Sequence, residues 1–182
     1  MKETPDLSIL ISPEDLSRRV AELAAEISRD YAQSSRFVAI GVLKGSVFFL
    51  VDLLKQVTVP VAVDFFQTAS YGNATSPGEV KIRKDVDISV RGADVLLVED
   101  IVDTGYTLRT ILDLLRFRGA KSVRLCALLD KAERRQVEVP IDYKGFQIED
   151  LFVVGYGLDY AEKYRNLPYI AVLSPEAETS EG

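Results

Sequence analysis

Residues 95–108 read VLLVEDIVDTGYTL, and this stretch decides how the chain folds. The apolar run from Val95 to Val98 is typical of a strand covered on both faces, because such a strand carries continuous rather than alternating hydrophobic residues. Two carboxylates, Glu99 and Asp100, follow directly, and an Asp-Thr-Gly turn then opens an amphipathic helix expected over 107–117. The stretch therefore predicts a strand–turn–helix unit with acidic side chains at the carboxyl end of a buried strand.

The rest of the chain alternates in the same way between strand and helix patterns. The first helix begins at Ser12-Pro13-Glu14-Asp15, which supplies a capping serine, a proline at the first helical position and acids at the positive end of the helix dipole. We expect helices over 12–32, 46–55 and 107–117, and strands over 37–43, 59–66, 95–98, 122–129, 152–156 and 169–173. This order predicts an α/β fold with a mostly parallel central sheet flanked by helices. In such sheets ligands bind at the carboxyl ends of strands, near a topological switch point.

A long polar connection interrupts this alternation over residues 67–85, QTASYGNATSPGEVKIRKD. A connection of this length inside a compact domain is unusual and often functional, so we expect a mobile loop here. Its end, with residues 87–90, also fits a hairpin arm. Because no repeat or linker divides the chain, we predict a single domain over residues 1–174, followed by an acidic, disordered tail over 175–182.

Composition excludes several kinds of chemistry. The 182 residues include 22 Lys and Arg, 28 Asp and Glu and no His, for a net charge of −6. Without His there is no Ser-His-Asp or Cys-His catalysis, and the single Cys126 allows neither an intrachain disulfide nor a Cys metal cluster. Any metal is therefore expected to be a hard cation such as Mg²⁺. The acidic balance argues against nucleic-acid and membrane partners, which attract basic surfaces.

No targeting signal is visible in the sequence. Residues 1–5 lack the apolar core of a signal peptide, and no apolar run approaches the roughly 18 residues of a membrane span. We therefore expect a cytoplasmic protein.

The turn after Glu99 and Asp100 has the features of a phosphate-binding loop. Backbone N–H groups of Thr104, Gly105, Tyr106 and Thr107 lie at the expected helix N-terminus, where they and the threonine hydroxyls can receive a phosphate. The two preceding carboxylates would repel that phosphate, so they fit ribose hydroxyls or a Mg²⁺ that the ligand brings. The plainer alternative is an acidic strand end and a capped helix, with Asp103 or Thr104 as the N-cap.

The complete strand–ED–xx–DTGxT–helix unit resembles the phosphoribosyl-pyrophosphate motif of the type I phosphoribosyltransferases. That family implies a small hood, built from the N- and C-terminal segments, beside the central sheet. The Leu43-Lys44-Gly45 segment resembles the pyrophosphate loop of the hypoxanthine-guanine phosphoribosyltransferases, in which a cis peptide turns backbone amides toward pyrophosphate. Ser70 and Tyr71 resemble that family's mobile catalytic loop, although Ala69 replaces the first Ser of the usual Ser-Ser-Tyr-Gly.

Two later segments are similar to the purine site of the same family. The resemblance implies that the purine lies among Lys131, Phe152, Val153 and Asp159, with Asp159 also binding a second Mg²⁺ and Arg165 contacting pyrophosphate. Lys131 would contact the 6-oxo group, because an ammonium only donates and so favours a 6-oxo over a 6-amino purine. Phe152 would stack on the base, and Val153 backbone groups would contact its edge. The plainer alternatives are a solvated lysine, an ordinary core phenylalanine and an exposed aspartate.

The resemblance implies Mg²⁺-dependent purine salvage. A 6-oxopurine, hypoxanthine or guanine, and phosphoribosyl pyrophosphate would give a nucleoside 5′-monophosphate and pyrophosphate through an oxocarbenium-like transition state. Residues 103–107 would hold the 5′-phosphate, Glu99 and Asp100 the ribose hydroxyls or Mg²⁺, and Lys44, Gly45 and Arg165 the pyrophosphate. In a chain without His, Asp103 is the candidate general acid/base at purine N7. The family also implies a homodimer or homotetramer.

Three alternatives to a hypoxanthine-guanine enzyme each imply a different ligand or a different function. Another acceptor, such as xanthine or a different nucleobase, is compatible with the same motif. A nucleotide-sensing regulator with this fold would bind RNA or DNA and would need a basic face, which a net charge of −6 does not favour. A phosphorelay receiver domain does not fit, because the acids lead into a phosphate cradle and no phosphoacceptor Asp follows an earlier strand.

Overall fold

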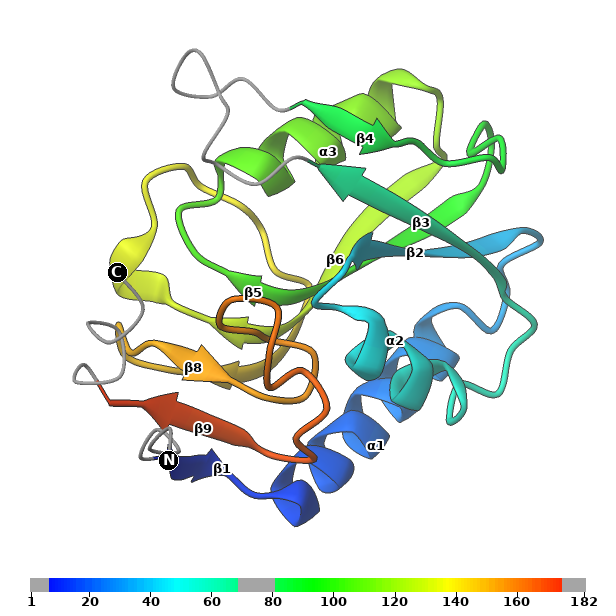
Figure 1. Cartoon of the computed structure of the whole chain (residues 1–182). Helices are drawn as coiled ribbons and strands as arrows, with labels where there is room; N and C mark the ends of the chain where they lie inside the picture. Colours follow the sequence, from blue (N-terminus) through cyan, green and yellow to red (C-terminus); the bar gives the residue numbers. More distant parts are fainter. Residues whose placement is uncertain (1–6, 69–80, 175–182) are drawn as a thin grey trace.

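The computed structural model describes residues 7–68 and 81–174 and contains two sheets (Figure 1). The larger sheet has the order β4-β3-β2-β5-β6-β7. Its strands are β2 (Phe37–Leu43), β3 (Ala62–Thr68), β4 (Ile82–Lys84), β5 (Asp94–Val102), β6 (Ser122–Asp130) and β7 (Tyr143–Gln147). All its neighbours pair in parallel except β4, which runs antiparallel to β3. The predicted α/β fold with a mostly parallel sheet is confirmed.

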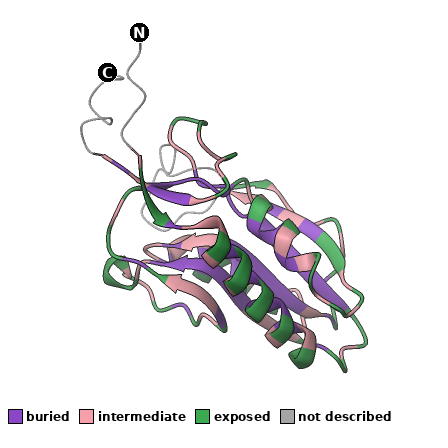
Figure 2. Ribbon diagram, turned by 90° about the horizontal axis from the view of Figure 1, so that it is seen from below, coloured by how far each residue is buried: buried purple, intermediate pink, exposed green. Residues whose placement is uncertain are grey.

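Helices cover both faces of this sheet. The helices α1 (Pro13–Asp30) and α2 (Val47–Leu54) lie on one face, and α3 (Tyr106–Phe117) lies on the other. The side chains of β2 alternate accordingly. Phe37 and Ala39 pack in the core beneath α1, whereas Val38, Ile40 and Val42 pack toward α3. The strands are therefore mostly buried, whereas the outer helix faces are exposed (Figure 2). No helix in the described part of the chain has both the length and the apolar character needed to cross a membrane.

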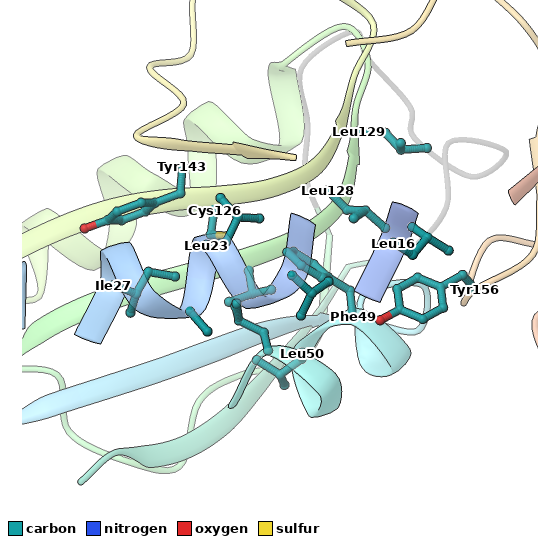
Figure 3. Close-up of a cluster of buried hydrophobic side chains, with 14 of the residues drawn as sticks. Leu16, Leu23, Ile27, Phe49, Leu50, Cys126, Leu128, Leu129, Tyr143 and Tyr156 are labelled. Carbon is teal, nitrogen blue, oxygen red and sulfur yellow. The ribbon is translucent and has the colours of Figure 1, made fainter. Parts of the chain in front are cut away.

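The first helix shows why these residues fold as they do. The Ser12 side chain accepts a hydrogen bond from the Asp15 backbone N–H at 3.1 Å, as its capping pattern predicts. The apolar positions Leu16, Leu23 and Ile27 are buried against the sheet, where they meet α2 and β6 side chains (Figure 3). Burying each such side chain stabilises the fold by roughly 1.5–3 kcal/mol. Helical periodicity alone therefore predicted the face that α1 buries.

A smaller antiparallel sheet joins the two ends of the described chain, in the order β1-β9-β8. It consists of β1 (Leu7–Ile11), β9 (Ile170–Leu173) and β8 (Val153–Val154), and it forms the hood that the resemblance implied. Strand β1 was not predicted, because three of its five residues are exposed and no alternating pattern marks it. Strand β7 was also missed, as was the 3₁₀ helix η2 (Ala132–Arg134).

The expected hairpin arm is present, but its second strand lies earlier in the chain than predicted. Strand β4 pairs with β3 through Gln67 and Lys84 and through Thr68 and Ile82, whereas residues 87–90 form no strand. Ser70, Tyr71 and most of the expected mobile loop lie outside the described residues, as does the tail over 175–182.

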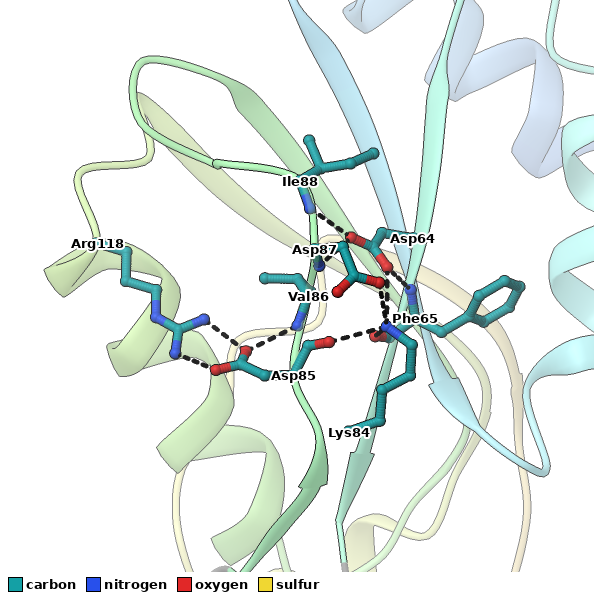
Figure 4. Close-up of polar contacts among 8 residues, drawn as sticks. All are labelled: Asp64, Phe65, Lys84, Asp85, Val86, Asp87, Ile88 and Arg118. Atoms are coloured by element: carbon teal, nitrogen blue, oxygen red, sulfur yellow. Dashed lines mark hydrogen bonds and ion pairs between the residues drawn. The ribbon is translucent and has the colours of Figure 1, made fainter.

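A buried carboxylate fastens this arm to the sheet (Figure 4). Asp64, on β3, is 6% exposed. Its Oδ2 accepts hydrogen bonds from the backbone N–H groups of Asp87 at 2.7 Å and Ile88 at 2.8 Å. Its Oδ1 accepts from the Phe65 N–H at 2.7 Å and from Lys84 Nζ at 3.3 Å. One side chain thus satisfies the backbone that leaves β4, which explains why that segment stays close to the sheet without forming a strand.

Replacing Asp64 with asparagine is expected to lower the free energy of unfolding by roughly 1–3 kcal/mol, because an amide has a single acceptor oxygen and cannot keep all the hydrogen bonds that the two carboxylate oxygens accept. Urea unfolding measures the change. Asp113→Asn is the control, since that carboxylate lies half-exposed on α3.

The same substitution carries a pH dependence. Burial raises the pKa of Asp64, but hydrogen bonds from Ile88, Phe65, Asp87 and Lys84 outweigh it, so the pKa lies below the ordinary value of 3.8. A carboxylate with a lowered pKa stabilises the fold above that ordinary value, and the contribution is lost as the pH falls through the folded-state pKa. The stability gap between wild type and Asp64→Asn should therefore shrink from pH 7 toward pH 3. A gap that stays constant would contradict this role.

Candidate active site

The strand order reverses between β2 and β5, and a cavity lies at that point. From β2 the chain passes through α2 to β3 on one side, and from β5 it passes through α3 to β6 on the other. A cavity of about 480 Å³ opens at the carboxyl ends of these strands, where α/β sheets bind ligands. The predicted site residues that line it are Lys44, Gly45, Glu99, Asp100, Asp103, Thr104, Gly105, Thr107, Asp159 and Arg165.

The loop after β2 lies against the carboxyl end of β5. The Leu43–Lys44 peptide bond is cis, as the resemblance implied. A Cβ atom on Gly45 would lie 1.6 Å from Asp100 Oδ2, so the Asp100 side chain would have to move to admit any larger residue at this position. The loop after β2 and the end of β5 are therefore packed against each other and form one continuous wall of the cavity.

The turn from residue 103 to 107 is held from behind by the segment that follows η2. Gly105 is the N-cap of α3, with a φ of +94° and no side-chain capping bond. The Thr104 carbonyl accepts hydrogen bonds from the backbone N–H groups of Gln136 and Val137, each at 3.0 Å. The alternative in which Asp103 or Thr104 is the N-cap is therefore wrong. The first N–H groups of a helix have no intrahelical acceptor, so the start of α3 at this cavity suits an anion.

Gly105→Ala is expected to destabilise the protein more than a second glycine substitution that shares its backbone geometry. A Cβ atom at residue 105 would lie 2.5 Å from the Val137 carbonyl oxygen, whereas Gly92, at a φ of +71°, has nothing within 4 Å. Both alanine variants should lose roughly 1–2 kcal/mol of stability, because alanine is strained in the left-handed conformation. Only Gly105→Ala adds a steric term of roughly 1–3 kcal/mol. Urea unfolding of the two variants measures the difference, and equal losses would show that Val137 does not confine the turn.

The two carboxylates after Val98 differ in environment. Glu99 is buried, and that burial raises its pKa well above the ordinary value, with a further increase from the Asp100 charge. Asp100 is partly exposed, and its Oδ1 accepts a hydrogen bond from the Ile101 N–H at 2.9 Å. A cation or a donating hydroxyl beside the pair would offset the repulsion between them.

These carboxylates fit a magnesium ion that a ligand helps to hold. No cluster of three or more Asp, Glu or Cys side chains that could hold a metal is found among residues 7–68 and 81–174. The cavity instead offers separate carboxylates, including Asp100 and Asp159. Mg²⁺ is commonly bound by one or two carboxylates, with substrate phosphates and water completing its octahedron.

Two of the cations on the cavity wall, Lys44 and Arg165, are paired with carboxylates. Lys44 Nζ lies 2.8 Å from Glu162 Oε2, and Arg165 Nη2 lies 2.8 Å from Asp159 Oδ1 and 3.4 Å from Glu162 Oε2. Arg165 Nη1 also donates to the Gly157 carbonyl at 2.7 Å. Because the Lys44–Glu162 pair is exposed, an incoming polyanion or a metal can rearrange it at little cost.

Sequence reasoning missed two charged residues of this cavity, Arg83 and Glu162. Arg83 lies in the polar connection that was predicted as a loop, and the pairing of β4 with β3 brings it to the cavity. Glu162 follows Asp159 in a turn with positive φ angles, where the Glu162 N–H donates to Asp159 Oδ2 at 2.9 Å. Its position three residues after the predicted Asp159 was the available signal.

Lys131, Phe152 and Val153 do not line this cavity, and neither does Tyr106. The Lys131 side chain is only 11% exposed, so it is not a solvated lysine. Phe152 is 42% exposed and meets Tyr160 edge-on at 5.7 Å, so it is not an ordinary core phenylalanine. Val153 is buried in β8, opposite Val172. The plainer alternatives for Lys131 and Phe152 are therefore wrong.

Asp103 is anchored through both its side chain and its backbone. Its Oδ1 accepts a hydrogen bond from Arg134 Nε at 2.9 Å, and its carbonyl accepts one from Arg135 Nε at 2.9 Å. Arg135 in turn contacts the buried Asp130, which also pairs with Lys144. Neither Arg134 nor Asp130 was predicted at the site, because a run of charges usually marks a solvated surface.

Comparison with known proteins gives one consistent result. Residues 11–161 match the phosphoribosyl transferase domain family. The chain is 51% identical over 168 residues to the hypoxanthine-guanine phosphoribosyltransferase of Bacillus subtilis, covering 92% of this chain and 93% of that protein. It is 47% identical over 167 residues to the hypoxanthine phosphoribosyltransferase of Haemophilus influenzae, covering 90% and 93%. A crystal structure of a hypoxanthine phosphoribosyltransferase from Staphylococcus aureus superposes with a TM-score of 0.89 at 44% identity, covering 93% of this chain and 92% of that one.

Proposed function

The chain belongs to the phosphoribosyl transferase family, and from that premise we propose that it is a purine-salvage enzyme. It transfers the 5-phosphoribosyl group of phosphoribosyl pyrophosphate to N9 of a 6-oxopurine, hypoxanthine or guanine. The observation that carries this proposal is the 95–108 unit, which sits at the switch point of the sheet with the start of α3 on the cavity wall. The products are a nucleoside 5′-monophosphate and pyrophosphate.

Different residues of the cavity are proposed to bind different groups of phosphoribosyl pyrophosphate. Residues 103–107 bind the 5′-phosphate at the N-terminus of α3, supported by the contact of Thr104 with Gln136 and Val137. Lys44, Gly45 and Arg165 bind the pyrophosphate on the opposing loops. Bound Mg²⁺ would supply positive charge against the departing pyrophosphate, and Glu99, Asp100 and Asp159 are the residues that would hold it.

The chemistry asks for positioning and for one proton transfer. The bond from C1′ to the pyrophosphate oxygen breaks, and the bond from C1′ to purine N9 forms with little covalent help from the protein. As N9 bonds, the purine gives up its N7 proton. Asp103 takes or shares that proton, since its side chain is half-exposed beside the cavity. Lys131 donates to O6, and Phe152 stacks on the base.

A turnover assay beside a gel shift separates an enzyme from a nucleotide-sensing regulator. The protein, Mg²⁺, hypoxanthine and phosphoribosyl pyrophosphate are incubated, and the nucleotide and pyrophosphate are quantified by chromatography. We expect stoichiometric formation of both products and no retention of RNA or DNA. Nucleic-acid binding without turnover would favour the regulator.

Lys131→Ala is expected to lower kcat/KM for hypoxanthine by roughly 10–100-fold, since a hydrogen bond to a charged group contributes about 1.5–3 kcal/mol. Activity with adenine, which presents an amino group to Lys131, should change little. The ratio of kcat/KM for hypoxanthine to kcat/KM for adenine should therefore fall. Steady-state kinetics with both bases measure the ratio. An unchanged ratio would show that Lys131 does not contact O6.

We also propose that the enzyme is cytoplasmic and forms a homodimer or homotetramer, with residues 1–174 as one catalytic domain. The exposed apolar side chains Phe48 and Val51 on α2, with Val63 on β3, support an oligomer. Light scattering during size-exclusion chromatography measures the state directly.

A further inference from the structure

Four charged side chains form a continuous chain of ion pairs beside the cavity. Arg134 Nε donates to Asp103 Oδ1 at 2.9 Å, and Arg134 Nη1 donates to Asp150 Oδ2 at 3.3 Å. The second oxygen of Asp150, Oδ1, accepts from Lys131 Nζ at 3.4 Å. Cations and anions therefore alternate in the order Lys131, Asp150, Arg134, Asp103.

The two ends of this chain follow neighbouring strands of the central sheet. Asp103 comes directly after β5 and Lys131 directly after β6, which pair in parallel up to Val102 and Asp130. The Lys131 N–H donates to the Val102 carbonyl at 3.0 Å, which fixes the two backbones side by side. An ammonium and a carboxylate carried by adjacent backbones attract each other, and a direct pair would occupy both groups. Asp150 and Arg134 give each end a different partner.

Both ends keep capacity for a ligand. An ammonium has three donors, so Lys131 can contact Asp150 and still donate elsewhere. On the Asp103 carboxylate, Arg134 holds Oδ1 and leaves Oδ2 without a hydrogen bond to any described residue. The guanidinium, with its rigid fork of donors, bridges two carboxylates at a fixed spacing. The series of ion pairs thus orients Asp103 and Lys131 and leaves both able to contact a ligand.

Stability is not a sufficient explanation for these contacts. The side chains of Asp103, Arg134 and Asp150 are 44%, 46% and 47% exposed. Ion pairs this exposed contribute little to folding, because water screens them. Their position between two candidate purine contacts points to a different use.

We propose that Arg134 and Asp150 are positioning residues that hold Asp103 and Lys131 against the N7 and O6 edge of the purine. This inference rests on the proposed function, which gives Asp103 the N7 proton and Lys131 the O6 contact. N7 and O6 lie next to each other on one edge of a 6-oxopurine, so the spacing between the two side chains matters as much as either side chain alone.

The test is steady-state kinetics of Arg134→Ala, Asp150→Asn and the double variant. Hypoxanthine is varied at saturating phosphoribosyl pyrophosphate, and phosphoribosyl pyrophosphate is then varied at saturating hypoxanthine. We expect kcat/KM for hypoxanthine to fall roughly tenfold in each single variant, while KM for phosphoribosyl pyrophosphate stays nearly unchanged. Arg134 and Asp150 act through the same series of ion pairs. The kcat/KM of the double variant for hypoxanthine should therefore be little lower than that of either single variant.

Arg116→Ala is the matched control, since Arg116 is 44% exposed and pairs with the exposed Asp113 on α3. It removes the same charge and should leave kcat/KM for hypoxanthine unchanged. Thermal unfolding of every variant should also match the wild type. Arg134→Lys keeps the charge without the two-sided fork, so it should recover only part of the loss.

The outcomes distinguish the positioning roles from the proposed function on which they rest. A wild-type protein that converts no 6-oxopurine would overturn the proposed function and the positioning roles together. An active wild type whose Arg134→Ala and Asp150→Asn variants keep or raise kcat/KM for hypoxanthine would overturn the positioning roles alone. Equal losses in both substrates, or fully additive losses in the double variant, would also contradict the proposed coupling.

Discussion

Asp103→Asn is expected to lower kcat by roughly 10²–10⁴-fold, the usual contribution of a positioned general base. Asparagine has nearly the same shape as aspartate but cannot take the N7 proton. The turn itself should survive, because Arg135 holds the carbonyl of residue 103 and the Thr104 carbonyl remains bonded to Gln136 and Val137. KM for phosphoribosyl pyrophosphate should therefore change little.

Steady-state kinetics and direct binding of phosphoribosyl pyrophosphate together test this expectation. Asp113→Asn, on the exposed face of α3, is the control for the loss of one carboxylate. An Asp103→Asn variant that keeps the wild-type kcat would remove Asp103 from the proton transfer. A variant that loses substrate binding as strongly as turnover would make Asp103 a residue of the phosphate loop only.

Removing Mg²⁺ with a chelator is expected to abolish turnover, and adding excess Mg²⁺ should restore it. Among the described residues, the cavity is lined by five acidic side chains and three basic ones. A ligand with several phosphate charges enters such a cavity unfavourably unless a cation accompanies it. Neutral backbone amides at Gly45 and at the start of α3 would provide part of the compensation, and the proposed Mg²⁺ would provide the rest.

The chelator experiment includes a titration that tests the carboxylates individually. Asp159→Asn should raise the Mg²⁺ concentration needed for half-maximal turnover, whereas Asp113→Asn should not. Full turnover in excess chelator would reject a metal requirement altogether.

The central sheet and its ligand edge were predictable because they depend on local pattern. Continuous apolar runs such as Val95 to Val98 indicate strands buried on both faces, and the periodicity from Leu16 to Ile27 indicates which face α1 buries. The strand–turn–helix unit likewise contains its own acids and its glycine within one short stretch of sequence, although Gln136 and Val137 also hold the turn. The cavity lining by Glu99, Asp100 and residues 103–105 agrees with that prediction.

Features that depend on pairing between distant residues were not predictable in this way. Strand β1 is mostly exposed and forms only against β9, more than 150 residues later. Arg83 reaches the cavity because β4 pairs with β3, and Asp64 binds backbone N–H groups more than 20 residues away. Arg134 and Asp150 read as ordinary surface charges until η2 and the segment before β8 are placed together. One sequence carries no record of such contacts.

An acceptor panel tests the central claim most directly. Wild-type protein, Mg²⁺ and phosphoribosyl pyrophosphate are incubated separately with hypoxanthine, guanine, xanthine, adenine, orotate and uracil, and nucleoside monophosphate and pyrophosphate are quantified. The account predicts rapid, equimolar formation of both products with hypoxanthine or guanine and far slower formation with adenine. Rapid turnover with adenine, orotate or uracil, or none with hypoxanthine or guanine, would contradict it.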